Sequence, residues 1–385
     1  MANVLFWLQR ALWLVLLLPQ TSAWPLQRSG NFSGDNDAHA ARAADAADDL
    51  PRLAIYFQTT HDGNGNPISM LPLITEKDIA LTHLIVCSFH INANSTIHLN
   101  DFPPDSPHFA TLWNETAILQ AAGIRVMGMV GGAAAGSFAA STLDGDDATF
   151  AVYYAQLHDA IVRYHLQGMD LDVEQAMSQA GITRLVQRLR ADFGGPGVFD
   201  ITLAPVASAL TNTDGSNDEA NLSGFDYAEL EATSGADISF YNAQFYNGFG
   251  SLGSPRDFET VVNAGWSPTK VLLGEITSPA EGYAYVTPDV LNATVVALRS
   301  AYGTLGGIMG WEYFNSNPGG TAAPWEWAQV MTAILRPNQV PRLTVTAADA
   351  QRLTMAWQES VVVAPGGADT DALAPAVNYV AMVNA

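Results

Sequence analysis

The feature that most constrains the fold is a regular alternation of short apolar runs with helical segments, from about residue 50 to residue 337. Eight runs rich in β-branched or apolar residues follow one another at intervals of roughly 30–45 residues, as strand–helix units require. The runs are Leu53–Gln58, Leu84–Phe89, Arg125–Val130, Gly168–Val173, Asp200–Ala204, Ser239–Tyr246, Lys270–Glu275 and Gly307–Trp311. In a chain of 385 residues this pattern predicts an α/β fold, a closed (β/α)8 TIM barrel over residues 50–337. An open doubly wound sheet is the alternative, but no G-x-G-x-x-G follows the first run.

The segments between the runs carry helical periodicity. Ala148–His165 and Gly181–Phe193 repeat apolar residues at three- and four-residue spacing. Pro288 and Pro324 each stand where a first-turn proline would open a further helix, the second of which covers Trp325–Leu335. These segments supply the helices that cover the strands.

The two ends of the chain differ from this pattern. Residues 1–23 combine Arg10, a short apolar run and small residues before Trp24, which indicates a secretory signal peptide and an extracellular protein. The apolar run is too short for a good membrane anchor. Residues 24–49 read as a disordered leader or pro-segment. Residues 338–385 read as a tail with one short helix, Ala347–Gln358, that either docks on the barrel or is removed.

Charge and cysteine content exclude several classes of protein. The net charge is −22, and the few basic residues form no cluster, which argues against nucleic acid and anionic membranes as partners and fits a neutral substrate. Cys87 is the single cysteine, and its apolar run predicts a packed core thiol. Nothing in the sequence demands more than a monomer. N-x-S/T sequons predict surface glycosylation at Asn31, Asn94, Asn114, Asn221 and Asn292.

The run Gly168–Glu174 is apolar at every second position and acidic at the positions between. Asp170, Asp172 and Glu174 therefore share one face of a strand, with their apolar neighbours on the other. Such a strand suits a barrel wall, with its apolar side under helices and its acids inside. Three carboxyl groups this close cannot all ionise, which is how one acid stays protonated beside an ionised one. A solvated acidic edge strand is the alternative.

Function in barrels of this type gathers at the C-terminal ends of the strands. There the sequence places aromatic rings, amides and a phenol, which suit a sugar because sugars combine apolar faces with hydroxyl groups. The candidates are Tyr56, Gly131, Gly132, Gln244, Tyr246, Asn247 and Trp311. Glu275 and Glu312 also end strands and are expected to be solvated or to support the site from behind. His61 has no partner at ligand spacing, so neither a metal nor another cofactor is predicted.

Four segments together resemble family 18 of the glycoside hydrolases, which contains chitinases and endo-β-N-acetylglucosaminidases. Gly168–Glu174 resembles the D-G-x-D-x-D-x-E signature, and Gln244–Asn247 resembles the tyrosine motif. Gly306–Trp311 resembles the last strand with its tryptophan, and Gly131-Gly132 resembles the glycines of the third strand. One departure is Gln167, where the family has an acid. Several segments are most similar to secreted fungal endo-β-N-acetylglucosaminidases, namely Tyr56–Asp62, Leu84–Asn92, Met127–Ala134, Tyr241–Gly250 and Gly310–Trp327.

The resemblance implies a single catalytic domain and a substrate-assisted retaining mechanism, in which the 2-acetamido oxygen of the substrate attacks the anomeric carbon. Glu174 would protonate the leaving oxygen, Asp172 would hold the acetamido N–H, and Asp170 would share a proton with Asp172. Tyr246 would donate to the acetamido oxygen. Trp311 would stack under the sugar, and Gln244 is a candidate polar contact.

The substrate class implied is an N-linked glycan, cut between its two core N-acetylglucosamines. The rival is a chitin-type oligosaccharide, cut by an endochitinase at the same linkage. A non-catalytic sugar-binding barrel is the third hypothesis, and such relatives typically lose the terminal acid that Glu174 supplies here.

Overall fold

The computed structural model describes residues 50–211 and 220–339, with a few positions between 346 and 355. The predicted signal peptide, the leader up to residue 49, Asn31 and most of the predicted tail, including much of Ala347–Gln358, lie outside these ranges.

Eight parallel strands close on themselves, as the alternating pattern predicts. The order of the sheet is β1-β9-β8-β7-β6-β5-β4-β2-β3, and a further pairing of β1 with β2 completes the ring. The parallel strands are β1 (Arg52–Phe57), β2 (His83–Asn92), β4 (Arg125–Gly131), β5 (Gly168–Asp172), β6 (Asp200–Leu203), β7 (Phe240–Gln244), β8 (Val271–Ile276) and β9 (Gly307–Trp311). The remaining strand, β3 (Thr96–Leu99), pairs antiparallel with β2 and forms a hairpin that the pattern of apolar runs does not predict.

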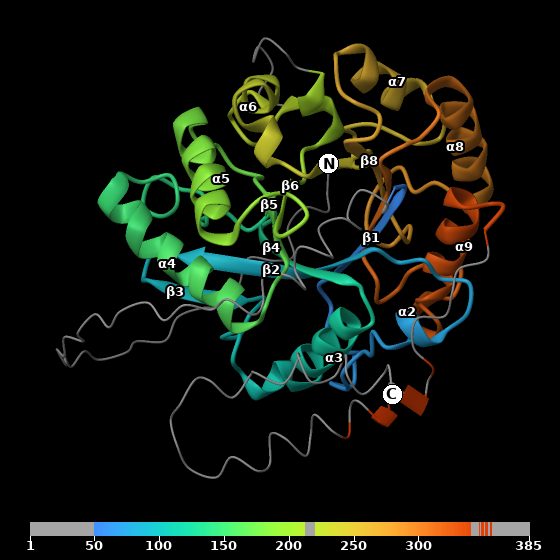
Figure 1. The fold of residues 1–385 in the computed structure, drawn as a ribbon, viewed down its shortest axis with the longest axis horizontal. Coiled ribbons are helices and arrows are strands. Elements are labelled where there is room, and N and C mark those ends of the chain that lie inside the picture. The colour runs from blue at the N-terminus through green and yellow to red at the C-terminus, as the bar shows by residue number, and fades with distance from the viewer. Residues whose placement is uncertain are drawn as a thin grey trace, which may run out of the picture.

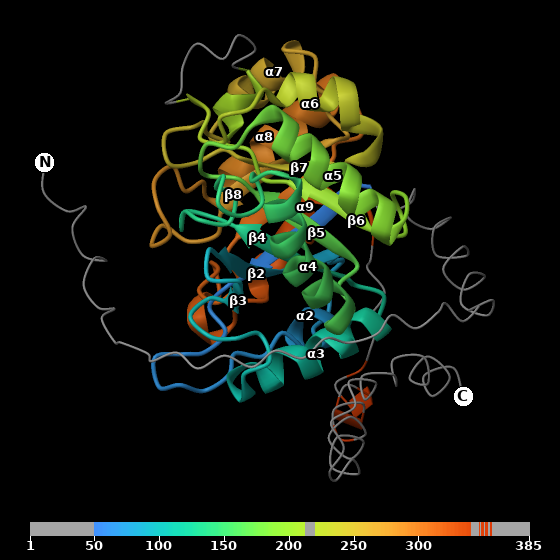
Figure 2. The ribbon, with the colours of Figure 1, turned by 90° about the vertical axis from the view of Figure 1, so that its left-hand side faces the viewer.

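Helices surround this barrel (Figure 1). They are α2 (Pro72–Thr75), α3 (Ala110–Ala121), α4 (Asp147–Arg163), α5 (Gln179–Phe193), α6 (Tyr227–Ser234), α7 (Arg256–Asn263), α8 (Pro288–Tyr302) and α9 (Glu326–Leu335). The side view shows α4 and α5 running next to each other on one flank (Figure 2). Side chains of Asp146 and Ser178 accept backbone N–H bonds at the starts of α4 and α5, which explains why these helices begin there.

Two apolar layers hold the barrel together. The larger lies between strands and helices and contains Met169, Leu171 and Val173, the apolar face predicted for the acidic strand. The smaller fills the inside of the barrel and includes Cys87, whose 0 % exposure confirms a buried core thiol. Parallel strands covered on the outside and filled on the inside are apolar on both faces, so a polar side chain inside them needs a specific partner.

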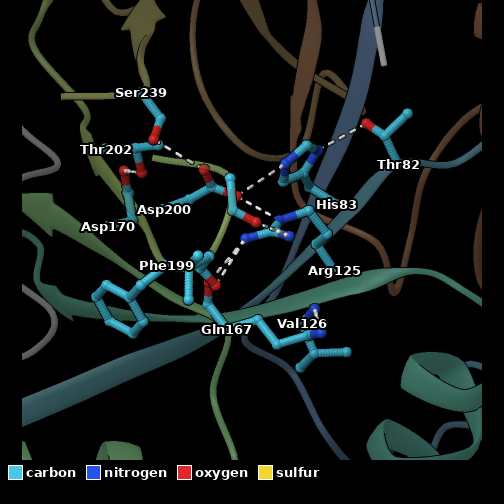
Figure 3. A network of polar contacts seen from close by, with 12 residues as sticks. Thr82, His83, Arg125, Val126, Gln167, Asp170, Phe199, Asp200, Thr202 and Ser239 are labelled. Atoms are coloured by element: carbon cyan, nitrogen blue, oxygen red, sulfur yellow. Dashed lines mark hydrogen bonds and ion pairs between the residues drawn. The ribbon is translucent and has the colours of Figure 1, made fainter. Parts of the chain in front are cut away.

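The N-terminal ends of the strands carry one such polar cluster, shown in Figure 3. The Asp200 carboxylate accepts a hydrogen bond from Arg125 Nε and one from the Ser239 hydroxyl at 2.8 Å. Its Oδ2 also lies 3.6 Å from His83 Nε2. Burial opposes ionisation of Asp200, but the hydrogen bond from His83 and the charge of Arg125 hold its pKa below the usual value.

The structure corrects part of the glycosylation prediction. Asn94 and Asn292 are exposed, in agreement with it. Asn114 and Asn221 are only 7 % and 9 % exposed. Asn114 is among the buried residues of α3, and the Asn221 Nδ2 donates to Phe225 O at 2.8 Å, so neither asparagine has the surface position that the prediction gave it. Among the described residues, no helix is long and apolar enough to cross a membrane.

Candidate active site

The acids of Gly168–Glu174 project from the C-terminal half of β5 into the barrel. Asp170 and Asp172 lie within the strand and are 0 % and 5 % exposed. Glu174 follows the strand by two residues and is half-buried. The alternative of a solvated edge strand is therefore wrong, because β5 pairs with β4 on one side and β6 on the other.

Asp170 is enclosed by three donors from three other strands. The Tyr56 hydroxyl donates to its Oδ2 at 2.7 Å, and the Thr202 hydroxyl donates to Oδ1 at 2.5 Å. The Asn242 Nδ2 donates to the same Oδ1 at 3.1 Å. Thr202 and Asn242 were not among the sequence candidates, although Asn242 lies two residues before Gln244 and so on the same face of its strand. That alternation is the signal that would have found it.

Asp172 and Glu174 form a connected pair with Gln244. The Gln244 Nε2 donates to Asp172 Oδ1 at 3.2 Å and to Ala204 O at 2.9 Å. The two carboxyl groups are within hydrogen-bonding reach of each other, and Gln244 also reaches Glu174. Gln244 thus fixes the pair from β7.

Burial disfavours the charged form of each acid. It raises the pKa of Asp170 even though three hydrogen bonds act in the opposite direction. Burial, followed by the charges of Glu174 and Asp170, raises the pKa of Asp172 well above its usual value. Burial also raises the pKa of Glu174. The site therefore retains protons that isolated carboxyl groups would have lost at the same pH.

Gly131 and Gly132 lie at the end of β4 against the backbone of the acidic strand. Gly131 has a φ of 107°, and a Cβ atom there would lie 2.2 Å from Asp172 O. The Gly132 N–H donates to the same oxygen at 2.9 Å. These contacts position Asp172, and a direct contact of either glycine with a sugar stays a prediction.

Aromatic side chains complete the mouth of the barrel. The half-buried Trp311 ring packs against Tyr56, with 5.4 Å between ring centroids. Tyr246, 6 % exposed, lies close enough to Asp172 and Glu174 for their charges to add to burial in raising its pKa, so its phenol remains a donor. Tyr56 is 2 % exposed and its hydroxyl is taken by Asp170, so its predicted contact with substrate stays a prediction.

Asn247 lies on the surface, unlike the buried candidate residues. It is exposed and adopts a φ of 55°, the left-handed region that asparagine tolerates. Its Oδ1 accepts from Tyr283 N at 2.8 Å, and its N–H donates to Tyr283 O at 3.1 Å. Asn247 therefore fastens the loop after β8 to the end of β7.

Glu275 and Glu312 are expected to be solvated or to support the site from behind, and the first of these alternatives is wrong, because each residue is 3 % exposed. Glu312 accepts from Gln58 N at 3.0 Å, Thr59 N at 2.8 Å and the Thr59 hydroxyl at 2.8 Å, and so ties β9 to the loop after β1. The Glu275 Oε1 accepts from Trp327 Nε1 of α9 at 3.0 Å. Burial raises the pKa of Glu275 to about 8.

Gln167 lies at the opposite end of β5 from the acidic pair. Its Oε1 accepts from Val126 N at 3.0 Å, and its backbone oxygen accepts from Arg125 at 3.2 Å (Figure 3). The departure from the family signature therefore lies near the start of the strand, away from the acidic pair. His61 stacks on His108 with 3.8 Å between ring centroids, and the described residues contain no group of acids, histidines or cysteines able to hold a metal ion.

Comparison with known proteins agrees with this geometry. The sequence profile described as "Glycosyl hydrolases family 18" matches residues 52–278. The solved structure of a fungal endo-beta-N-acetylglucosaminidase of that family is 62 % identical, with a TM-score of 0.72 over 76 % of this chain and 100 % of that one. Chitinase ChiC from Aspergillus fumigatus is 44 % identical, with a TM-score of 0.65 over 73 % of this chain and 98 % of that one.

More distant structures share the fold. A putative chitinase A from Streptomyces coelicolor is 19 % identical and has a TM-score of 0.57, over 74 % of this chain and 98 % of that one. No curated protein matches the chain. The profile covers more than half of the sequence, and it includes Asp170 and Asp172 of β5 and Glu174 after it. The chain is therefore a member of glycosyl hydrolase family 18, a glycosidase built on a (β/α)8 barrel.

Proposed function

We propose that the protein is an endo-β-N-acetylglucosaminidase that cuts between the two core N-acetylglucosamines of N-linked glycans and leaves one sugar on the protein. The observation that carries this proposal is the 62 % identity to a fungal endo-beta-N-acetylglucosaminidase along the full length of its solved chain. The 44 % identity to a fungal chitinase keeps an endochitinase as the second candidate.

In the first chemical step the acetamido oxygen of the substrate attacks the anomeric carbon while the bond from that carbon to the leaving oxygen breaks. Glu174 transfers its proton to the leaving oxygen, a role for which its raised pKa suits it. Asp172 accepts the acetamido N–H and stabilises the positive oxazolinium ion. Because the nucleophile belongs to the substrate, all the acids of this mechanism can come from one strand.

In the second step water opens the oxazolinium ring. Glu174, now ionised, takes a proton from the water molecule while the water oxygen attacks the anomeric carbon. The bond from that carbon to the acetamido oxygen breaks, and the acetamido group is restored. Two displacements at the same carbon retain its configuration. Asp170, which lies deeper in the barrel, shares a proton with Asp172 and so helps to set the charge of Asp172. The Tyr246 phenol orients the acetamido oxygen for attack. Trp311 supports the sugar ring as an apolar floor.

Two substrates separate the candidates. A high-mannose glycoprotein such as ribonuclease B and a chitin oligomer are incubated with the enzyme, and products are identified by mass spectrometry. Release of free glycan that carries one N-acetylglucosamine, without hydrolysis of the chitin oligomer, supports the proposal. Hydrolysis of the oligomer alone would assign the protein as a chitinase.

The Glu174→Gln variant tests the assigned proton donor. We expect kcat to fall on the order of 1,000-fold, because general acid catalysis contributes roughly 100- to 10,000-fold, while sugar binding measured by calorimetry persists. Glu229→Gln is the control, since Glu229 is an exposed acid on α6 outside the site. Normal turnover by Glu174→Gln would refute the role of Glu174. If the parent protein binds sugar but does not turn it over, the non-catalytic alternative is favoured.

Secretion of a monomeric enzyme is part of the same proposal. The predicted signal peptide of residues 1–23 supports export, and the exposed sequons Asn94 and Asn292 are compatible with it. N-terminal sequencing of the protein recovered from culture medium, together with light scattering, tests both points. A mature chain beginning at Met1 would overturn the assignment of the signal peptide.

A further inference from the structure

Glu174 follows the end of β5, outside the paired part of the strand. β5 ends at Asp172, whose backbone oxygen accepts the N–H of Gly132 at 2.9 Å. Two residues further along the chain, the Glu174 side chain still reaches Asp172 and Gln244. Because proton transfer needs the two heavy atoms within about 2.6–3.2 Å of each other, contacts from outside the sheet have to set the direction of the Glu174 side chain.

The segment of residues 221–227, which leads into α6, supplies those contacts through Ser223. The Ser223 hydroxyl donates to Val173 O at 2.6 Å. That oxygen belongs to the planar peptide group that joins Val173 to Glu174, so the bond sets the plane from which the Glu174 Cα and Cβ continue. Beyond Glu174, the Met177 N–H donates to Ser223 O at 2.9 Å. Ser223 therefore holds the chain on both sides of the acid.

Ser223 is itself held in place by its neighbours in the segment. It is 2 % exposed, and its N–H donates to Asn221 Oδ1 at 2.9 Å. The next residue, Gly224, has a φ of 77°, and a Cβ atom there would lie 2.9 Å from the Cα atom of Ala176. A glycine is therefore needed for the segment to approach the loop that follows Glu174 this closely.

Tyr227, at the start of α6, supports the hydroxyl of Ser223. The two hydroxyl oxygens are 2.8 Å apart, and both residues are buried. A carbonyl oxygen can only accept, so the single hydroxyl proton of Ser223 goes to Val173 O, and Tyr227 is the donor in its contact with Ser223. Burial, together with the charges of the nearby acids, raises the pKa of Tyr227, so the phenol keeps the proton that it donates. Two hydrogen bonds in series polarise each other, which strengthens the bond to Val173 O.

We propose that Ser223, supported by Tyr227, is a positioning residue that directs the Glu174 carboxyl group at the leaving oxygen. Both side chains act through the peptide group before Glu174 and not by contact with the sugar. This inference rests on the proposed role of Glu174 as the proton donor. It does not depend on which of the two glycosidase activities the barrel performs.

The experiment compares leaving groups that need different amounts of proton transfer. 2,4-Dinitrophenol leaves readily as an anion, whereas the more basic 4-methylumbelliferone leaves faster when an acid protonates it. Both are attached to N,N′-diacetylchitobiose if the parent cleaves the chitin oligomer, or to the high-mannose glycan ending in one N-acetylglucosamine if it cleaves ribonuclease B. The quantity measured is kcat/KM, because it reports the step in which the bond to the leaving group breaks.

In Ser223→Ala we expect kcat/KM to fall on the order of 10-fold for the 4-methylumbelliferyl glycoside and much less for the dinitrophenyl glycoside. A misdirected acid retains part of the roughly 100- to 10,000-fold that general acid catalysis contributes. A purely structural role would lower both values by one factor, through the folded fraction. Tyr227→Phe should act in the same direction but less strongly, and it carries the test if Ser223→Ala does not fold.

Thr332→Val is the matched control. Thr332 is also 2 % exposed, and its hydroxyl donates to Ala328 O at 2.7 Å within α9, outside the candidate active site. Its replacement should leave the ratio of the two kcat/KM values as it is in the parent.

Glu174→Gln separates failure of this inference from failure of the proposed function. It should show a larger loss than Ser223→Ala, with the same dependence on the leaving group. If Glu174→Gln loses equally with both leaving groups, Glu174 is not the proton donor, and the inference falls with that role. If Glu174→Gln shows the dependence but Ser223→Ala, or Tyr227→Phe in its place, keeps the parent ratio, the inference alone is overturned.

Discussion

Asp170 shows at the scale of single residues how the barrel controls protonation. It is completely buried, yet donors from β1, β6 and β7 satisfy both of its oxygens. Burial raises its pKa and the donors lower it. The balance between burial and hydrogen bonding therefore sets the charge that Asp170 presents to Asp172.

Thr202→Val tests this balance because it keeps the shape of the side chain and removes one donor. The pKa of Asp170 should rise further, so the limb of the pH–rate profile that reports the Asp170–Asp172 pair should move to higher pH. Activity should fall about 10- to 100-fold, since a buried hydrogen bond to a charged group contributes roughly 1.5–3 kcal/mol. Kinetics across pH provide the measurement.

Thr294→Val is the control for Thr202→Val. Thr294 is buried on α8 and donates to Leu252 O at 2.9 Å, outside the site. Its replacement should cost stability without moving the pH profile. If the pH–rate profile of Thr202→Val is not shifted, the Thr202 hydroxyl does not help to set the charge of the acids.

Glu275 gives a second prediction at this scale, in stability rather than activity. Its folded pKa of about 8 exceeds the ordinary value of 4.5, so the folded state binds its proton more tightly than the unfolded state. The parent therefore loses stability as pH rises between these two values, by at most about 1.4 kcal/mol per pH unit. Glu275→Gln removes the titrating carboxyl group. The free energy of unfolding of this variant should therefore increase relative to that of the parent as pH rises between these two values.

Urea denaturation of the parent and of Glu275→Gln at several pH values checks this expectation. Glu76→Gln changes an exposed acid and should show no such trend. A difference between Glu275→Gln and the parent that stays constant with pH would mean that Glu275 is ionised inside the fold.

At the scale of elements, the end of β4 determines where the end of β5 lies. Gly131 pairs with Asp172 in register, and the neighbouring Gly132 N–H bonds to the Asp172 backbone. A side chain at Gly131 would occupy the place of the Asp172 carbonyl. The glycine pair thus permits the close approach of two strands that brings Asp172 into its place.

Gly131→Ala should displace the acidic strand and lower kcat on the order of 100-fold, since a misplacement near 1 Å can cost that much. Gly123→Ala is the matched control, because Gly123 also has a positive φ, of 96°, but faces open space. It should show only the conformational cost of about 1–2 kcal/mol in stability. Equal losses of activity in the two variants would attribute the effect to backbone strain rather than to contact with Asp172.

At the scale of the whole molecule, the candidate catalytic residues and the main buried ion-pair cluster lie at opposite ends of the barrel. The acidic trio and the aromatic floor lie at the C-terminal ends of the strands, and the cluster around Asp200 lies at the N-terminal ends. That cluster joins β2, β4 and β6, with Ser239 immediately before β7. It closes the end of the barrel opposite the candidate active site.

Asp200→Asn should destabilise the fold by about 3–5 kcal/mol, the cost of breaking a buried ion pair, while the folded fraction keeps its activity. Since the folded pKa of Asp200 is lowered, its contribution is complete above the unfolded pKa and is lost as pH falls through the folded value. The stability gap should therefore persist at neutral pH and close only in strong acid. Urea denaturation at pH 7, where the gap should be complete, and at pH 3, where it should only have begun to narrow, measures it.

Replacing both partners provides the control for Asp200→Asn. Asp200→Leu with Arg125→Met removes the ion pair without leaving a buried charge, and should recover much of the lost stability. Loss of turnover in folded Asp200→Asn would show that this end of the barrel does influence the chemistry.

Much of the architecture could be predicted from local periodicity. The eight runs became the eight parallel strands, with ends displaced by at most a few residues, because each run is bounded by loops and apolar on the faces that the barrel buries. Asp170, Asp172 and Glu174 could be placed inside from alternation alone. The hairpin strand β3 escaped prediction, since Thr96–Leu99 is short and pairs only at the edge of β2.

The sequence by itself determined the barrel and the acidic face of one strand, because both follow from which residues repeat along the chain. Only the tertiary structure decided which side chains meet across the barrel. Tyr56 and Asn242 reach Asp170 from positions 114 and 72 residues away, and Asn221 loses its place on the surface to a backbone hydrogen bond. Those contacts depend on strand order and register, which arise from the packing of the whole chain and leave no local pattern.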